Sequence, residues 1–154
     1  MQKLTWPQVN TWRLAQQQLL ARAEAAELLS VVTRLGGVQA QLMSAAELAL
    51  WVRVQGITPV DIQRLLWTER QLIKTWAMRG TLHLLTATDF GQLVAAWGAT
   101  TVKRPPSYYT YHKVTSAELT AIMETVPLVL NATPRTREAL ADAVVERTGN
   151  PNLR

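Results

Sequence analysis

One short interruption of an otherwise helical pattern limits the folds open to this chain. Residues 72–78 and 81–85 form two strand-like runs, and Arg79-Gly80 between them is typical of a hairpin turn. On both sides of this segment, apolar residues recur at the spacing of amphipathic helices. The pattern therefore gives no support to a large sheet or to repeated strand-helix-strand units.

Helix start signals divide the first part of the chain into several helices. Thr5 and Thr58, each closely followed by a proline, start two of them, and a further helix is expected over residues 25–35. Ser44 opens a capping box for another helix, and Thr86 caps the helix that follows the hairpin. The first helix is expected to face the core with an inward stripe of Val9, Trp12, Gln16 and Leu19.

Helices followed by a single hairpin are in the order of a winged helix-turn-helix. We therefore predict a mainly α fold, with one module over residues 1–98 and the β-hairpin as its wing. The helix after the 36–41 turn, at residues 44–54, is nearly all apolar, so we expect it to be buried. This argues against reading of base edges by that helix, because base readout needs polar side chains.

The turn Gly36-Gly37-Val38-Gln39-Ala40-Gln41 places two long amides between two predicted helices. Gly36 is the residue type that ends a helix in a left-handed cap. If the turn is extended, residues two apart project to one side, and the amides of Gln39 and Gln41 point at the same volume. The alternative is that these glutamines only cap chain ends or solvate the turn.

The composition favours a polyanionic partner and excludes several kinds of chemistry. Lys and Arg number 16 against 11 Asp and Glu, which gives a net charge of +5. A basic protein without such a partner is the alternative. The absence of cysteine and the wide separation of His83 and His112 argue against a metal site, and no cofactor is expected. We find no long apolar run and no signal peptide, so no membrane association and a cytoplasmic, nucleoid-associated location are expected.

Residues 99–114 interrupt the helical pattern and contain no acidic side chain. We predict a linker whose basic residues follow a phosphate backbone while its tyrosines stack on bases. The alternative is a solvated connector whose tyrosines pack against a neighbouring domain. The DNA-binding candidates in this linker are Lys103, Arg104, Tyr108, Tyr111 and Lys113.

Residues 115–154 are expected to begin a second winged-helix module. Thr115 opens a capping box, and Pro127 is expected to bend or end the helix that follows. Two helices bury too little surface to close a core. We therefore expect the 154-residue chain to be folded to about Trp97, and loose or self-associated beyond about Thr115.

Three strings of the sequence, taken in order, resemble one known family. They are Gly-Gly-Val-Gln-Ala-Gln at 36–41, Trp-Ala-Met-Arg-Gly-Thr-Leu-His-Leu at 76–84 and Thr-Arg-Glu-Ala-Leu at 136–140. Together they resemble the bacterial AlkZ/YcaQ-like winged-helix DNA glycosylases over essentially the whole chain. Members of that family are longer, with tandem winged-helix modules and a C-terminal β-barrel. The resemblance thus implies an N-terminal portion with little glycosylase activity of its own.

The resemblance implies that Gln39 and Gln41 form the catalytic Gln-x-Gln of the AlkZ-like branch, since the related branch has Gln-x-Asp. It further implies excision of N7-alkylated or crosslinked purines from double-stranded DNA, in an open cleft. Arg79 is the candidate phosphate contact at the hairpin tip. His83 either faces the cleft or hydrogen-bonds within the hairpin, and the second interpretation is preferred. The alternative function is a non-enzymatic winged-helix DNA-binding or regulatory protein.

Overall fold

The computed structural model describes residues 3–100, 105–131 and 133–154, except for the side chains of Arg79 and Thr100. The chain divides into two compact units, Met1–Thr101 and Val102–Arg154. Lys103 and Arg104, two of the predicted DNA contacts, lie outside the described residues, and of Arg79 only the backbone is described.

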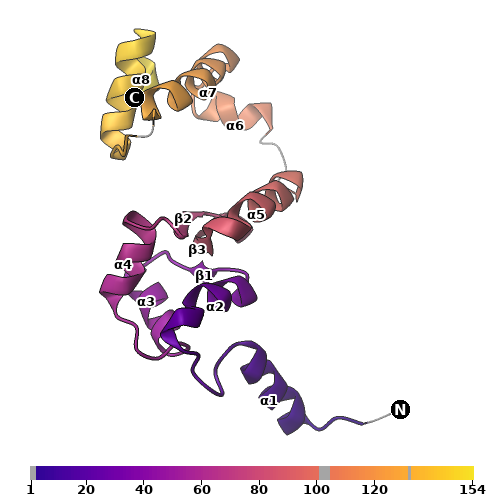
Figure 1. Cartoon of the computed structure of the whole chain (residues 1–154). Helices are drawn as coiled ribbons and strands as arrows, with labels where there is room; N and C mark the ends of the chain where they lie inside the picture. The colour runs from indigo at the N-terminus through magenta and orange to yellow at the C-terminus, as the bar shows by residue number, and fades with distance from the viewer. Residues whose placement is uncertain (1–2, 101–104, 132) are drawn as a thin grey trace. The chain divides into compact units, whose positions relative to one another are not determined.

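The first unit combines helices with one small sheet (Figure 1). Its helices are α1 (Trp6–Gln16), η1 (Ala25–Glu27), α2 (Leu28–Leu35), α3 (Met43–Trp51), α4 (Pro59–Trp67), η2 (Met78–Gly80) and α5 (Ala87–Thr100). Its strands are β1 (Val38–Gln39), β2 (Leu72–Trp76) and β3 (Leu82–Thr86), in the antiparallel order β1-β3-β2. The predicted hairpin is confirmed as β2 and β3, joined through η2. The winged-helix fold predicted from the sequence is confirmed.

The helix-turn-helix differs from the one that the sequence suggested. The two helices directly before the wing are α3 and α4, so α4 holds the position of the recognition helix, and the turn before α3 lies outside the motif. The expectation that residues 44–54 are buried is also wrong. Ala46 and Leu50 of α3 are buried, but Leu48 and Trp51 are exposed.

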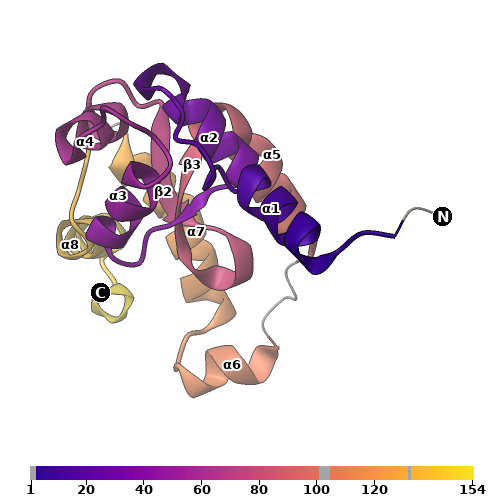
Figure 2. The same cartoon turned by 90° about the horizontal axis from the view of Figure 1, so that it is seen from below.

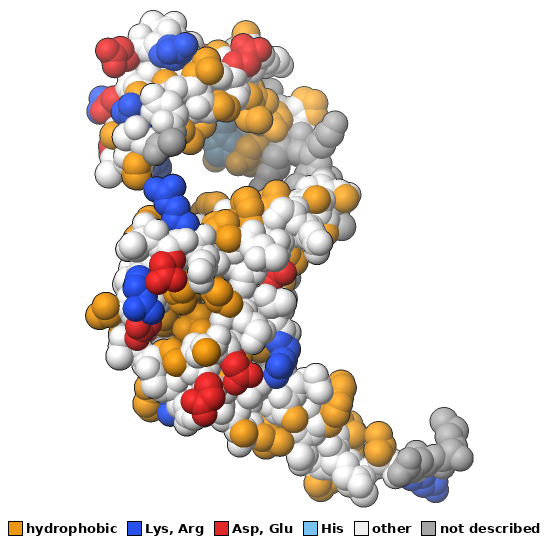
Figure 3. Space-filling view, viewed as in Figure 1, with side chains coloured by type: hydrophobic (Ala, Val, Ile, Leu, Met, Phe, Trp, Pro, Cys, Tyr) orange, Lys and Arg blue, Asp and Glu red, His pale blue; other side chains and the backbone are white. Residues whose placement is uncertain are grey.

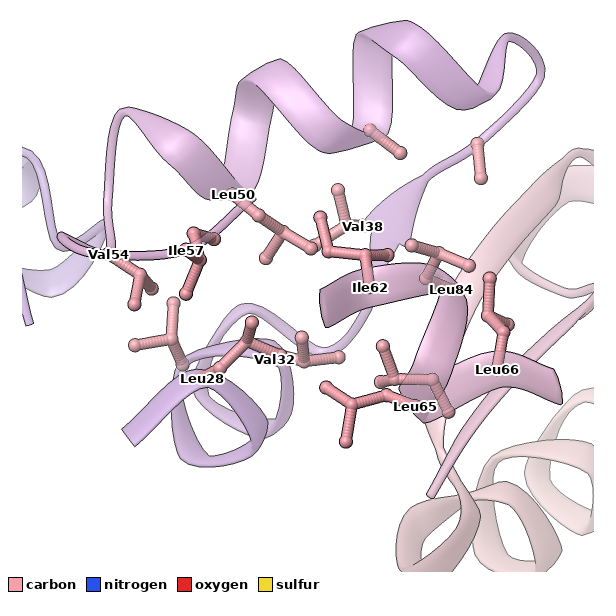
Figure 4. Close-up of a cluster of buried hydrophobic side chains, with 14 of the residues drawn as sticks. Leu28, Val32, Val38, Leu50, Val54, Ile57, Ile62, Leu65, Leu66 and Leu84 are labelled. Atoms are coloured by element: carbon pink, nitrogen blue, oxygen red, sulfur yellow. The ribbon is translucent and has the colours of Figure 1, made fainter. Parts of the chain in front are cut away.

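A hydrophobic core holds the helices α2, α3 and α4 of the first unit onto the sheet (Figure 4). Helix α2 packs against β3, α3 against β1 and α4 against β2. Figure 2 shows α2 beside β3. Each element contributes the apolar residues of one face. The fully buried side chains include Val31, Val32, Leu50, Val54, Ile62, Leu72 and Leu84.

Some of the predicted helix starts are observed and one is not. Thr5 accepts a hydrogen bond from the Gln8 amide, and Thr86 accepts one from the Asp89 amide. Ser44 is not a cap, because α3 already begins at Met43. Extended backbone at Leu42 leads directly into α3 and leaves no turn for Ser44 to cap.

The inward stripe predicted for the first helix is wrong. No residue of α1 is buried, and Trp6 and Trp12 are largely exposed. The helix has the expected N-terminal cap and spacing, but in Figure 1 it extends away from the sheet. Local pattern therefore predicted its conformation but not its packing.

In the residues that the structure describes, the second unit consists of helices and their connections. They are α6 (Pro106–Tyr111), α7 (Ser116–Leu130), α8 (Arg137–Thr148) and η3 (Pro151–Leu153). The predicted capping box is present, with the Thr115 amide and hydroxyl both donating to Glu118 at 2.8 Å. Pro127 does not end α7, which continues to Leu130. Helices α7 and α8 pack on each other. Among the described residues of the second unit, the buried ones are Thr125, Val129 and Val144.

We expect amide hydrogen exchange to divide the chain between the two units. Amides of β3 and α2 should be the most protected, since Val32 and Leu84 are fully buried there. Amides of α7 and α8 should exchange faster, because few described side chains are buried around them. Exchange measured by mass spectrometry on peptides from both units tests this. Equal protection of α7 and β3 would contradict the expectation.

Candidate functional site

The segment that carries the two glutamines is extended, as the hypothesis of a shared polar site requires. Val38 and Ala40 are buried, whereas Gln39 and Gln41 are exposed. This alternation is the side-chain pattern of a strand, in which residues two apart lie on one side. The apolar pair is therefore directed into the core and the glutamine pair away from it.

Pairing with the wing fixes this segment in place. Val38 lies opposite Leu84 and Gln39 opposite His83, and the Ala40 amide donates to the Leu82 carbonyl at 2.7 Å. The Leu82 amide donates in turn to Oε1 of Gln41 at 2.8 Å. The Gln41 side chain therefore extends the strand pairing by one hydrogen bond.

This contact distinguishes the two glutamines. Gln41 partly fulfils the capping role that we considered, because its oxygen binds a backbone amide. Its carboxamide keeps two N–H donors and a second lone pair on the oxygen for other partners. The bond also holds the carboxamide in one position. The side-chain entropy lost in this way is lost on folding, and not again when DNA binds.

Two glycines with positive φ connect α2 to the glutamine segment. Gly36 ends α2 in the left-handed conformation, with φ of 70°, as predicted. Gly37 has φ of 109° and lies so close to β3 that an added Cβ would be 2.5 Å from Cδ2 of Leu85 and 3.2 Å from the Leu84 carbonyl oxygen. Glycine at position 37 is what allows the backbone to meet the sheet at this point.

His83 forms the hydrogen bond within the hairpin that we preferred from the sequence. Its Nδ1 lies 2.9 Å from the Thr81 carbonyl oxygen. The side chain is half-buried, and its strand position places it beside Gln39 on β1 and Thr75 on β2. The cleft role considered for His83 stays a prediction.

Helix α4 offers few unengaged polar groups for reading a base sequence. Arg64 pairs with Asp61 at 3.3 Å and with Glu69 at 2.9 Å. Gln63 donates to Glu47 at 3.2 Å and accepts from the Trp67 indole at 2.8 Å. On the face drawn in Figure 3, acidic and basic side chains of the first unit alternate rather than form one basic patch. These contacts disfavour a sequence-reading regulator.

Aromatic side chains are exposed on the wing and in the predicted linker. Trp76, the last residue of β2, is 56% exposed. In the second unit, part of the linker expected over 99–114 forms the helix α6. There Tyr111 is 82% exposed, and its ring contacts His112 edge-on with centroids 5.1 Å apart. Both rings are accessible for stacking on a base.

Neither a metal centre nor a membrane span is found in the described part of the chain. Those residues contain no group of three or more His, Asp or Glu side chains placed to hold a metal ion. Their helices are too short or too polar to cross a bilayer.

Helices α2, α3 and α4, packed on a three-stranded antiparallel sheet whose hairpin β2–β3 is the wing, place the first unit in the winged-helix class. Its exposed glutamine pair lies on the extended segment that begins with β1. A family model described as DNA glycosylase AlkZ-like matches residues 32–153. The chain belongs to this AlkZ-like DNA glycosylase family.

The chain is similar to a relative and to a solved structure from Streptomyces sahachiroi, and in both comparisons it spans less than half of the matched protein's length. The interstrand DNA cross-link repair glycosylase of Streptomyces sahachiroi is 35% identical over 143 residues, 93% of this chain and 38% of that protein. The solved structure of Streptomyces sahachiroi DNA glycosylase AlkZ matches with a TM-score of 0.80 at 32% identity. That match covers 99% of this chain and 43% of the solved one.

Proposed function

We propose that the protein is a DNA glycosylase that hydrolyses the N-glycosidic bond of N7-alkylated purines, including crosslinked ones. The observation that carries this proposal is the exposed pair Gln39 and Gln41, held side by side on an extended segment in a chain of a DNA glycosylase family. The name of the similar Streptomyces sahachiroi protein, an interstrand cross-link repair glycosylase, supports crosslinks as one substrate class.

The chemistry of the substrate explains why two neutral amides are sufficient. A purine alkylated at N7 carries a positive charge, so its bond to deoxyribose is already weakened and no strong general acid is required. The sugar becomes cationic as this bond breaks, as in other glycoside hydrolysis, and a water must then attack it. Amide oxygens accept hydrogen bonds from that water and direct their dipoles at the cation.

The two glutamines are proposed to divide this task. Gln41 is fixed by the Leu82 amide, so its oxygen occupies a defined position beside the wing. Gln39 is exposed, and its Oε1 accepts a hydrogen bond from the attacking water. Unlike a carboxylate, neither amide costs a charge desolvation when DNA covers the site. Double-stranded, damaged DNA is therefore the proposed partner, and the nucleoid the proposed place of action.

Release of the damaged base is the direct test of this function. The full-length protein is incubated with a DNA duplex that contains one N7-methylguanine, and free base and abasic strand are measured. We expect both to form in equal amounts, without a cofactor. Binding of the duplex without any base release, from this lesion or from an N7-crosslinked duplex, would overturn the proposal.

The remaining DNA contacts are proposed to lie in the segment between the two predicted modules. Replacing Lys103, Arg104 and Lys113 together by alanine should weaken binding equally for all sequences. It should also reduce the salt dependence of binding by up to about three phosphate contacts. Titrations at several salt concentrations measure this slope. An unchanged slope would show that residues 99–114 only connect the modules.

We also propose that residues 115–154 begin a second winged-helix module. The capped helix α7, its packing against α8, and the burial of Val129 on α7 and Val144 on α8 support this, since such modules open with packed helices. The first module would then be residues 1–98, as the sequence analysis predicts.

A further inference from the structure

Apolar groups from the wing fill the space beside Gly37, at the start of the glutamine segment. A Cβ added at Gly37 would lie 2.5 Å from Cδ2 of Leu85 and 3.4 Å from Cε of Met78. Leu85 belongs to β3, whereas Met78 belongs to the turn η2. The methionine side chain therefore reaches back from the tip of the wing to the beginning of the glutamine segment.

The strand register places this apolar group on the same face of the sheet as Gln39. Gln39 lies directly opposite His83, so their side chains share one face. Leu85 is two residues after His83 on β3 and therefore projects to that face as well. Because the methyl group of Met78 and Cδ2 of Leu85 lie against the same point beside Gly37, Met78 also borders this face.

The glutamine segment thus has a polar end and an apolar end. At Gln41 the side chain is bound by the Leu82 amide. At Gly37, two residues before Gln39, the neighbours are Leu85 and Met78. Leu85 is buried, but Met78 is 39% exposed, so of these two apolar side chains Met78 is the one that a ligand can reach.

The turn fixes the backbone of Met78 and leaves its side chain adaptable. The Met78 carbonyl accepts hydrogen bonds from the Thr81 amide at 3.4 Å and from the Thr81 hydroxyl at 3.1 Å. The side chain itself is unbranched, and its polarisable thioether adjusts to surfaces of different shape. Such a group can contact apolar ligands of more than one size.

The chemistry of an N7-alkylated purine brings its substituent close to the reacting bond. N7 and N9 belong to the same five-membered ring and are separated only by C8, and N9 forms the bond to deoxyribose. Residues two apart along a strand are about 7 Å apart. With the sugar at Gln39, a substituent of several atoms on N7 can therefore reach the apolar end of the segment.

We propose that Met78 is a specificity-determining residue, which contacts the alkyl substituent on N7 of the damaged purine. The contact removes apolar surface of the substituent from water, so it favours larger apolar substituents over a methyl group. This inference rests on the proposed glycosylase function and adds the group that selects among its substrates.

Two substitutions at Met78 separate an apolar contact from mere occupation of space. Met78→Leu keeps the apolar volume, and such swaps are well tolerated. Met78→Gln keeps the unbranched length but replaces the thioether and methyl group by a carboxamide. Leu48→Gln is the matched control, since Leu48 is an exposed apolar residue on α3.

Single-turnover base release by the full-length protein is measured on duplexes with one N7-methylguanine or one N7-benzylguanine. We expect the ratio of the benzyl rate to the methyl rate to fall about tenfold in Met78→Gln, the usual effect of losing a small apolar contact in a pocket. Met78→Leu and Leu48→Gln should keep the wild-type ratio. Loss of folded protein lowers both rates alike and leaves the ratio unchanged. An unchanged ratio in Met78→Gln, or an equal fall in any of the other variants, would overturn the proposal.

NMR of the methionine methyl groups gives a readout that does not depend on excision. The chain has four methionines, of which Met43 packs against the core. In the ¹³C-methyl-labelled chain, the benzyl duplex should shift the Met78 signal more than the methyl duplex does, because an aromatic ring shifts a methyl group beside it. The Met43 signal should not distinguish the duplexes.

Equal shifts of the Met78 signal with both duplexes would refute the contact. If neither duplex releases a base while the Met78 signal still distinguishes them, the glycosylase function fails and the contact stands. If both bases are released with a ratio that is insensitive to Met78→Gln, the function stands and the specificity role fails.

Discussion

Gln39→Ala is expected to slow base excision by about 10²–10³-fold, the usual effect of removing one group that stabilises developing charge. Gln39 is exposed and its side chain lies on the side of β1 away from the core. The variant should therefore keep the melting temperature of the wild type within about 2 °C. Single-turnover release of N7-methylguanine and thermal unfolding of the full-length protein measure the two effects.

The companion variant Gln41→Ala should lose excision to a similar extent and also some stability. Its side chain accepts from the Leu82 amide, and loss of such a bond typically costs about 1 kcal/mol. In Gln41→Glu the carboxylate still accepts from that amide, so stability should be retained. This variant separates the hydrogen bond from the chemistry of the amide.

Gln16→Ala, an exposed glutamine on α1, is the control for the loss of a glutamine as such. It should change neither excision nor stability. Normal excision by both Gln39→Ala and Gln41→Ala would remove the catalytic assignment. A large loss of stability in Gln39→Ala would instead show that this residue only supports the turn.

The sequence predicted those parts of the fold that depend on local signals. The hairpin was readable from the change of period at Leu72, and the caps at Thr5, Thr86 and Thr115 from the residue types that bind free helix amides. Packing was not readable in the same way. The apolar spacing of α1 is compatible with a buried helix, yet its tryptophans are exposed, because burial depends on what the rest of the chain brings near.

The candidate site shows the same limit. Gln39 and Gln41 could be chosen from the sequence because extended backbone places alternate residues on one side. The contact of Gln41 with Leu82 joins residues 41 positions apart, so no local pattern predicts it. The strand register that sets His83 opposite Gln39 is equally non-local. Once the hairpin and the glutamine turn are paired, both contacts follow from the geometry of an antiparallel sheet.

The position of the site depends on Gly37, and Gly37→Ala is expected to destabilise the first unit by about 2–4 kcal/mol. Two costs add. The backbone of Gly37 has φ of 109°, which residues with a side chain rarely adopt, and the new Cβ would lie 2.5 Å from Cδ2 of Leu85. Leu85 is buried, so it has little room to move. The 3.2 Å approach to the Leu84 carbonyl oxygen involves backbone and cannot be relieved by a rotamer change.

Gly36→Ala provides the matched control. Gly36 also has a positive φ, of 70°, but a Cβ added there meets nothing within 4 Å. We expect it to cost about 1 kcal/mol, the backbone term alone. Urea unfolding of the three proteins measures the difference, which isolates the contact with Leu85. If β1 moves to relieve the contact, Gly37→Ala should also shift the Gln39 and His83 resonances and slow excision, whereas Gly36→Ala should not. Equal stabilities of the two variants would mean that β1 does not lie against β3 as closely as described, and the placement of Gln39 on β1 beside the wing would lose its structural basis.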